Sequence, residues 1–220
     1  ITLDIERPEG KDLVKRLTER VDWVLESFRP GYLDEIGLGY DTLRRSNPDL
    51  VMTSITPFGQ SGPYRDYKAN DLVAMAMGGY LYLCGDADRA PAGISVEHAC
   101  QHGSGEAAAA SVMALWHREM TGRGQFIDVS IQASLVCCAG NAPVWWDVKK
   151  TMITRMGAYR GGLTGGVPQR QTWPCKDGHI GCVPSVNCVL TERSPAVRDA
   201  KMTLLAGILL LWNMQDFSQR

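Results

Sequence analysis

Hydrophobic and polar residues alternate along the first 135 residues in a way that predicts helices and strands in turn. Apolar residues recur at helical spacing over residues 8–20, where we expect an amphipathic helix. Short apolar runs predict strands at 1–5, 23–25, 50–55 and 126–131. Further helices are expected at 32–36, 40–47 and 70–83. Helices alternating with strands in this way are typical of an α/β fold with a parallel sheet.

The most informative stretch is 94–135. It is rich in alanine from Glu106 to Arg118, which favours a helix. The small residues at 107–111 would let this helix pack closely against a sheet. A glycine-containing break at 121–124 separates it from the strand at 126–131. Helix, tight turn and strand therefore form one arm of an α/β layer.

The remaining chain predicts less regular structure. One long helix or two helices are expected from Gln132 to about Met156. A glycine-rich loop follows at 159–168, and residues 173–181 predict a hairpin that turns at Asp177 and Gly178.

Composition narrows the functional class. The chain has 220 residues, 45% of them hydrophobic, and a net charge of -1, so neither nucleic acid nor a membrane is expected as a partner. Its seven cysteines, without a signal peptide, indicate reduced thiols in a cytoplasmic protein. Their spacing does not fit a zinc site, so no metal is expected. The chain begins with Ile1 inside a strand pattern, and we expect it to be part of a longer protein.

Two loops follow predicted strands and would lie at one edge of the sheet. They carry the runs FRPG at 28–31 and PFGQSGP at 57–63. Ligands of parallel α/β sheets bind at the carboxyl ends of the strands. This edge is therefore a candidate binding site.

Several motifs, in order and spacing, resemble one known family from residue 1 to about 186. They are ITLDIERPEG, ESFRPG, IGLGYDTLRRSNPDLV, TSITPFGQSGP, NDLVAMAMGGY, HREMTGRGQFIDVSIQ and WPCKDGHI. The chain is similar to the family III CoA-transferases, also called the CaiB/BaiF family. That family includes formyl-CoA transferase, carnitine CoA-transferase and α-methylacyl-CoA racemase.

The resemblance implies a large CoA-binding domain with a Rossmann-like parallel sheet, joined by linker helices to a smaller domain. It places the large domain, without its N-terminal part, at 1–135, linker helices at 136–165 and the start of the small domain at 166–220. From about residue 187 the sequence no longer resembles the family. The resemblance also implies two interlocked subunits, either identical or a heteromer with a related subunit.

For the ligand, the resemblance implies a CoA thioester as substrate, a carboxylic acid as acceptor and no permanently bound cofactor. The residues it implies for CoA binding are Ser27, Phe28, Arg29 and Lys68. Core packing for Phe28, and solvated surface charge for Arg29 and Lys68, are the alternatives. Glu35 replaces an arginine of formyl-CoA transferase, which removes a positive charge from the expected nucleotide site.

The resemblance also implies an aspartate nucleophile just before the alanine-rich helix. Counting back from Leu115 places it near Cys100, but no aspartate occurs at 99–102. A carboxylate at a helix N-terminus could attack a thioester with backbone N–H groups stabilising the oxyanion. The substitutes that we consider are Glu97, Asp71 and Glu106. His102 and His98 are candidate bases, with helix capping or packing as the alternative, and Cys100 is a further candidate nucleophile.

Three functional hypotheses follow. The first is an acyl-CoA transferase that moves CoA between carboxylic acids, with Gly165 and Gly166 in a loop over the active site, although an ordinary linker is equally expected there. The second is a racemase. Asn70 weakens this hypothesis, because it stands where the racemases carry a histidine and an asparagine cannot move a proton. The third is a non-catalytic subunit that supports an active partner.

Overall fold

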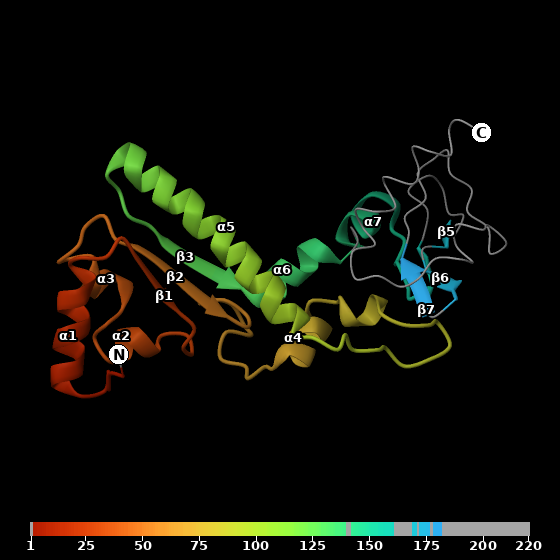
Figure 1. Ribbon diagram of the computed structural model, residues 1–220, viewed down its shortest axis with the longest axis horizontal. Helices are drawn as coiled ribbons and strands as arrows, with labels where there is room; N and C mark the ends of the chain where they lie inside the picture. Colours follow the sequence, from red (N-terminus) through yellow and green to blue (C-terminus); the bar gives the residue numbers. More distant parts are fainter. Residues whose placement is uncertain (1, 140–141, 161–168, 171, 177, 182–220) are drawn as a thin grey trace. The chain divides into compact units, whose positions relative to one another are not determined.

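The computed structural model describes residues 2–139, 142–160, 169, 170, 172–176 and 178–181. The chain divides into two compact units, one of Ile1–Leu83 with Ala92–Met152 and one of Cys84–Pro91 with Ile153–Arg220. The first unit contains the sheet and most of the helices (Figure 1). The boundaries expected at residues 135 and 165 stay predictions.

The central element of the first unit is a parallel three-stranded sheet. Its strands β1 (Trp23–Glu26), β2 (Val51–Thr56) and β3 (Phe126–Ser130) lie in the order β1-β2-β3. The middle strand β2 is buried along almost its whole length, as expected of a continuous apolar strand that is covered on both faces. The predicted parallel α/β fold is confirmed.

Three helices pack on one face of this sheet. They are α1 (Pro8–Thr18), α2 (Tyr32–Glu35) and α3 (Tyr40–Leu43). Pro8 suits the first turn of α1 because its ring presets the helical φ and its missing N–H is not needed there. The core on this face is formed by buried side chains from the α3 region and β2, namely Leu38, Leu43, Leu50 and Met52.

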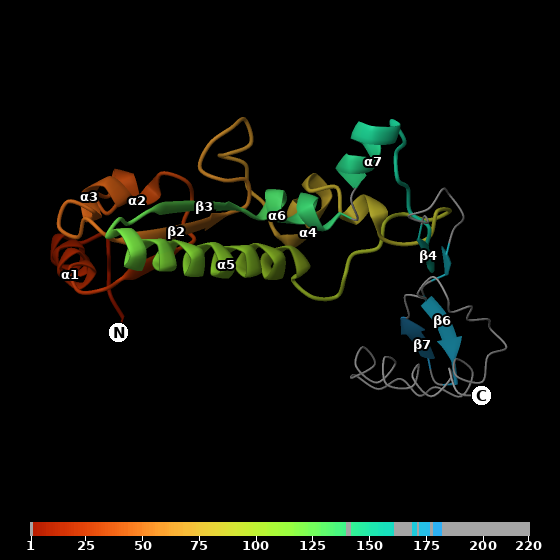
Figure 2. The same cartoon turned by 90° about the horizontal axis from the view of Figure 1, so that it is seen from above.

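The long helix α5 (His98–Thr121) covers the opposite face and runs along β2 and β3 (Figure 2). Its buried residues are all small and recur every three or four positions: Ala99, Gly103, Ala107, Ser111 and Ala114. The hydroxyls of Ser111 and Thr53 lie 2.7 Å apart, which brings the helix directly onto β2. The close packing predicted from the small residues is confirmed, although α5 begins eight residues before Glu106.

Four shorter helical segments complete the described part of the first unit, and two of them pack on α5. They are α4 (Asp71–Met77), a 3-10 turn (Leu81–Leu83), α6 (Ile131–Cys138) and α7 (Ala142–Lys149). A second core joins α4, α5 and α6 through Ala74, Met75, Ala99 and Leu135. The segment after β3 forms two helices that end at Lys149, not at Met156. No helix in the described part of the chain is long and apolar enough to cross a membrane.

One predicted strand is wrong. Residues 2–4 adopt no regular structure, and a turn follows in which the Asp4 carboxylate accepts a hydrogen bond from the Glu6 N–H. Alternation of side chains cannot form a strand where no neighbouring strand pairs with the backbone, and β1 is an edge of the sheet as described.

The second unit contains short antiparallel pairs. Strands β6 (Thr172–Cys175) and β7 (Gly178–Gly181) form the predicted hairpin. Strands β4 (Tyr159–Arg160) and β5 (Gln169–Arg170) pair at the two ends of the glycine-rich segment. Gly165 and Gly166 lie outside the described residues, as does the chain after residue 181.

Candidate functional site

The loops that follow β1 and β2 meet at the carboxyl edge of the sheet. Gln60 joins them, because its side-chain oxygen accepts a hydrogen bond from the Gly31 N–H at 3.3 Å. Its amide nitrogen donates to the Ser54 hydroxyl of β2 at 2.7 Å. Its backbone N–H donates to the Asp128 carboxylate of β3 at 2.9 Å. Gln60 thus connects the loop after β1 with strands β2 and β3. The sequence analysis did not identify this residue.

Two of the predicted CoA-binding residues, Ser27 and Phe28, lie exposed just beyond β1. The Phe28 ring is 45% exposed and packs against the Tyr32 ring, with 5.2 Å between centroids. Core packing is therefore not the role of Phe28 in this fold. Lys68 is exposed as well, in the segment that leads to α4.

Arg29 is also exposed, but its charge is already engaged. Its guanidinium makes a two-pronged ion pair with the Glu35 carboxylate, in which Nη1 and Oε1 are 2.8 Å apart. The hydrogen bond from Arg29 lowers the pKa of Glu35, and the same contact raises the pKa of Arg29. The negative charge that sequence comparison noted at residue 35 therefore neutralises the neighbouring cation.

A second arginine at this edge was not foreseen. Gly31 has a φ of +78°, and a Cβ at this position would lie 2.6 Å from Nη2 of Arg65. The guanidinium of Arg65 thus lies directly over the glycine of the FRPG run, and its side chain is 41% exposed. Tyr64 and Tyr67 flank it in sequence, with ring centroids 5.3 Å apart and both rings exposed. The signal in the sequence that could have identified Arg65 is its position between two tyrosines directly after the PFGQSGP run.

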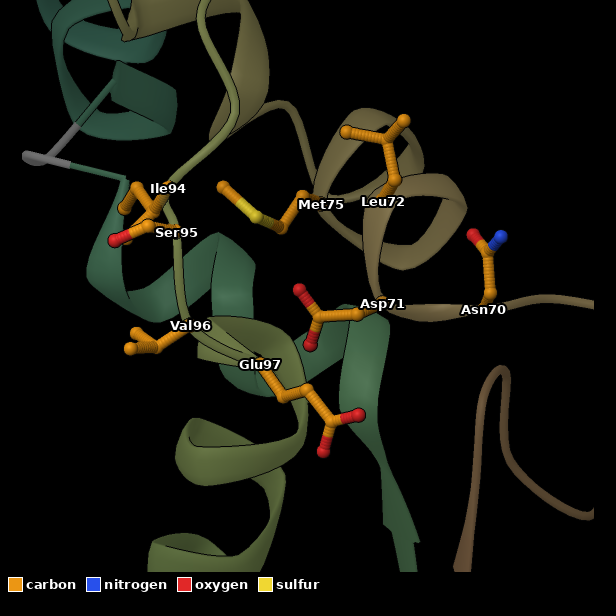
Figure 3. A pocket seen from close by; sticks show the side chains of 8 residues that line it. All are labelled: Asn70, Asp71, Leu72, Met75, Ile94, Ser95, Val96 and Glu97. Carbon is orange, nitrogen blue, oxygen red and sulfur yellow. The ribbon is translucent and has the colours of Figure 1, made fainter.

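A pocket of about 390 Å³ lies between α4 and the segment that leads into α5 (Figure 3). Its lining residues come from 70–75 and 94–97: Asn70, Asp71, Leu72, Met75, Ile94, Ser95, Val96 and Glu97. The Asp71 carboxylate points from the start of α4 toward the 94–97 segment, and Glu97 lies beside it (Figure 3). Two of the candidate catalytic acids therefore share one pocket.

The pocket lies at the N-terminus of α5. Asp71 Oδ1 accepts a hydrogen bond from the Cys100 N–H at 3.0 Å, so the aspartate caps α5 from another helix. Glu97 is the residue that precedes α5, and its side chain makes no capping hydrogen bond. The helix dipole favours negative charge at this end, which suits both carboxylates.

Cys100 is a poor nucleophile in this setting. Burial raises the pKa of its thiol, and the negative charges of Asp71 and Glu97 raise this pKa further. A raised pKa leaves less of the reactive thiolate at neutral pH.

The other candidates lie outside the pocket lining or have other contacts. Asn70 caps α4, because its side-chain oxygen accepts a hydrogen bond from the Val73 N–H at 3.0 Å. Glu106 is exposed on the third turn of α5. His102 contacts His98 and the Cys138 thiol instead of lining the pocket. Within the described residues, no group of three or more His, Cys, Asp or Glu side chains could hold a metal ion.

The first unit is thus an α/β domain with a parallel sheet covered by helices on both faces, and it has a pocket that two carboxylates line. The family model that matches the chain, over residues 1–197, is CoA-transferase family III. The chain belongs to CoA-transferase family III.

Relatives of known name agree with this assignment. The chain is 36% identical over 182 residues to the BbsE subunit of succinyl-CoA:(R)-benzylsuccinate CoA-transferase from Thauera aromatica, covering 82% of this chain and 42% of that protein. It is 44% identical over 131 residues to succinyl-CoA–D-citramalate CoA-transferase from Chloroflexus aurantiacus, covering 60% and 33%. The chain thus spans less than half the length of these relatives.

Solved structures show the same fold. A CaiB/BaiF family protein from Brucella suis is similar with a TM-score of 0.72 and 34% identity, covering 81% of this chain and 46% of that one. The resemblance seen in the sequence motifs is therefore confirmed in both sequence and fold.

Proposed function

We propose that the protein carrying this chain is a CoA-transferase that moves CoA between two carboxylic acids through acyl-enzyme intermediates. The observation that carries the proposal is the shared pocket of Asp71 and Glu97 at the N-terminus of α5. Carboxylates in such a position can attack a thioester, and membership of CoA-transferase family III supplies the class of substrate.

Glu97 is the proposed nucleophile because its carboxylate makes no capping hydrogen bond. Its carboxylate attacks the thioester carbonyl, the carbon–sulfur bond breaks, and CoA leaves as a thiolate, so that the acyl group and Glu97 are joined as a mixed anhydride. The thiolate then attacks the glutamyl carbonyl and releases the first acid, which leaves CoA joined to Glu97. A second carboxylate then attacks the glutamyl carbonyl of this thioester, the carbon–sulfur bond breaks, and CoA thiolate leaves a new mixed anhydride behind. The thiolate attacks the acyl carbon of the new acid, which forms the new CoA thioester and releases the free Glu97 carboxylate.

Asp71 has a different proposed role. One of its oxygens already accepts the Cys100 N–H, so its position is fixed. Asp71 lies beside Glu97 (Figure 3), and its proposed role is to hold the start of α5 in place next to the reacting thioester. His102 is assigned no direct part in this reaction, because its ring nitrogens contact His98 and Cys138.

For CoA itself, the edge formed by the two loops is the proposed nucleotide site. Phe28 offers an exposed ring to the adenine, Ser27 a hydroxyl, and Lys68 a charge to the phosphates. Arg65 adds a second cation, with its Nε 3.7 Å from the exposed Asp66 carboxylate, whereas Arg29 is held by Glu35 through two hydrogen bonds. CoA is a substrate here, and no permanent cofactor is proposed. The covering role of Gly165 and Gly166 and the cytoplasmic location also stay predictions.

A supporting subunit of a heteromeric transferase is the second candidate. Cys100 stands where the family resemblance places the nucleophilic aspartate, and some relatives are named as subunits. One is the beta subunit of succinyl-CoA–L-malate CoA-transferase from Chloroflexus aurantiacus, 36% identical over 160 residues. Two interlocked copies of one chain are the alternative assembly. The racemase hypothesis loses support, because Asn70 caps α4 and has no proton to exchange.

The proposal is tested by measuring CoA transfer from succinyl-CoA to a panel of carboxylic acids with the purified full-length protein. Glu97→Gln should lower kcat by about a hundredfold or more, because an amide cannot replace the nucleophile. Glu106→Gln is the matched control and should retain activity, since Glu106 is exposed and lies outside the pocket lining. Equal activity of wild type and Glu97→Gln refutes the assigned nucleophile. Activity only with a second, related chain supports the subunit reading.

A further inference from the structure

A thiol and two imidazoles form a continuous chain of contacts between α5 and α6. Cys138 Sγ lies 3.1 Å from Nδ1 of His102, and Nε2 of His102 lies 3.1 Å from Nε2 of His98. The Tyr80 ring packs beside both histidines, with centroids 5.0 Å from His98 and 6.4 Å from His102. All four residues are partly buried.

The arrangement has the parts of an activated nucleophile. The thiol has a base within hydrogen-bonding distance, and the base contacts a third polar group. When Nδ1 of His102 takes the thiol proton, both ring nitrogens become donors. One N–H then donates to the thiolate and the other to the neutral His98 ring, so both contacts remain hydrogen bonds.

Cys100 and Cys137 lack this setting, and the thiol of Cys84 has a raised pKa. Burial raises the pKa of Cys84 and, together with nearby carboxylates, that of Cys100. Cys137 is exposed, and no hydrogen bond to its thiol is found in the described part of the chain. Among Cys100, Cys137 and Cys138, the thiol that contacts an imidazole is that of Cys138.

We propose that Cys138 accepts an acyl group from acyl-CoA by thiol–thioester exchange, with His102 as the base; the choice of donor rests on the proposed function. Cys138 Sγ forms a bond to the thioester carbonyl carbon, and the bond from that carbon to the sulfur of CoA breaks. The proton taken by His102 passes to the departing CoA thiolate. Thiol and thioester are exchanged, so no oxidant, reductant or further reactant is required.

The test incubates the full-length protein with succinyl-CoA at neutral pH and locates succinyl thioesters by peptide mass spectrometry. We expect a thioester on Cys138 in the wild type and in Cys137→Ser. The thioester on Cys138 should form at about one tenth of the wild-type rate, or more slowly still, in His102→Gln, because the base is removed. A thioester found mainly on Cys137, formed equally fast in His102→Gln, or absent from Cys138 overturns the proposal.

Alkylation by iodoacetamide controls for folding and for substrate binding, because this probe does not require a CoA site. Cys138 should react about tenfold more slowly in His102→Gln, while the rate at Cys137 should not change. Equal Cys138 rates in the two proteins refute the role of His102. Acylation of Cys138 in a protein without transferase activity would refute the proposed function alone, and transferase activity with an unacylated Cys138 would refute this inference alone.

Discussion

The Asp71 carboxylate accepts a 3.0 Å hydrogen bond from the backbone N–H of Cys100, which joins the first turns of α4 and α5 across 29 positions of sequence. A helix leaves its first N–H groups without intrahelical partners, and this aspartate satisfies one of them from outside the helix. The same contact brings Asp71 beside Glu97 at the positive end of α5. The aspartate that caps α5 is therefore also one of the two carboxylates that line the pocket.

Removing this cap should destabilise the protein. Asp71→Ala is expected to lower the free energy of unfolding by about 1 kcal/mol, a common cost for a lost N-cap. Asp71→Asn keeps an acceptor oxygen and should cost less than half of that. Urea denaturation of the full-length variants measures both values. An alanine variant as stable as the asparagine variant would show that the hydrogen bond does not support α5.

Releasing Arg29 should strengthen CoA binding. Glu35→Gln removes the carboxylate that neutralises the Arg29 guanidinium, so the cation becomes available to phosphates. We expect the Kd for succinyl-CoA, measured by calorimetry, to fall several-fold at low salt and to depend more strongly on salt. The same change in an Arg29→Ala background should give no gain. Unchanged or weaker binding in Glu35→Gln would place the phosphates away from Arg29.

The ion pair between Arg118 and Asp49 should make a contribution to stability that is lost in acid. The mostly buried Arg118 guanidinium binds Asp49 at 2.8 Å and the exposed Asp22 at 2.7 Å. The hydrogen bond from Arg118 lowers the pKa of Asp49 below its usual value. Because the folded pKa is depressed, the contribution is present above about pH 4 and is lost as the pH falls below about 4.

The size of this contribution is about 1 kcal/mol, since Asp49 is partly exposed to solvent. Asp49→Asn should lower stability by about this amount at pH 7 and by much less at pH 3. Asp22→Asn, the matched control, should change the pH dependence less, because Asp22 is 74% exposed. Thermal unfolding at the two pH values measures this. An equal loss at both values in Asp49→Asn would contradict the account.

Two glycines of α5 should respond in opposite directions to alanine. A Cβ on Gly103 would lie 2.8 Å from Cγ1 of Ile131, a stiff branched side chain, so Gly103→Ala should destabilise by about 1–3 kcal/mol. Gly105 is exposed with no neighbouring atom within 4 Å of its Cβ position, so Gly105→Ala should stabilise by about 0.5–1 kcal/mol. Chemical denaturation compares them, and the same sign for both would contradict the described packing of α5 on α6.

The sequence predicted the order of strands and helices in the first unit because the apolar periods are long and regular there. It did not predict the early start of α5 at His98. The residues at 98–105 are not alanine-rich, and their helix depends on Asp71 and on the core formed with α4 and α6. It also predicted a strand at 1–5, where no neighbouring strand in the described part of the chain pairs with the backbone.

The site was predicted in part. The family resemblance predicted Asp71 near the expected active site, and Glu97 was predicted from its closeness to Cys100 in the sequence; the structure places both in one pocket. Their roles stay predictions. The contact between Cys138 and His102 spans 36 positions, and only the packing of α6 on α5 brings them together. Gln60 and Arg65 were missed for the same reason, since their partners lie on other loops.

The most direct test of the central claim is to trap the acyl-enzyme. The full-length protein is incubated with a panel of acyl-CoAs and hydroxylamine, and peptide mass spectrometry locates protein hydroxamates. We predict a hydroxamate on Glu97 in the wild type and none at this position in Glu97→Gln. A hydroxamate on Asp71 or Glu106 instead, or none with any acyl-CoA that measurably binds, would contradict the assignment of Glu97 as the nucleophile.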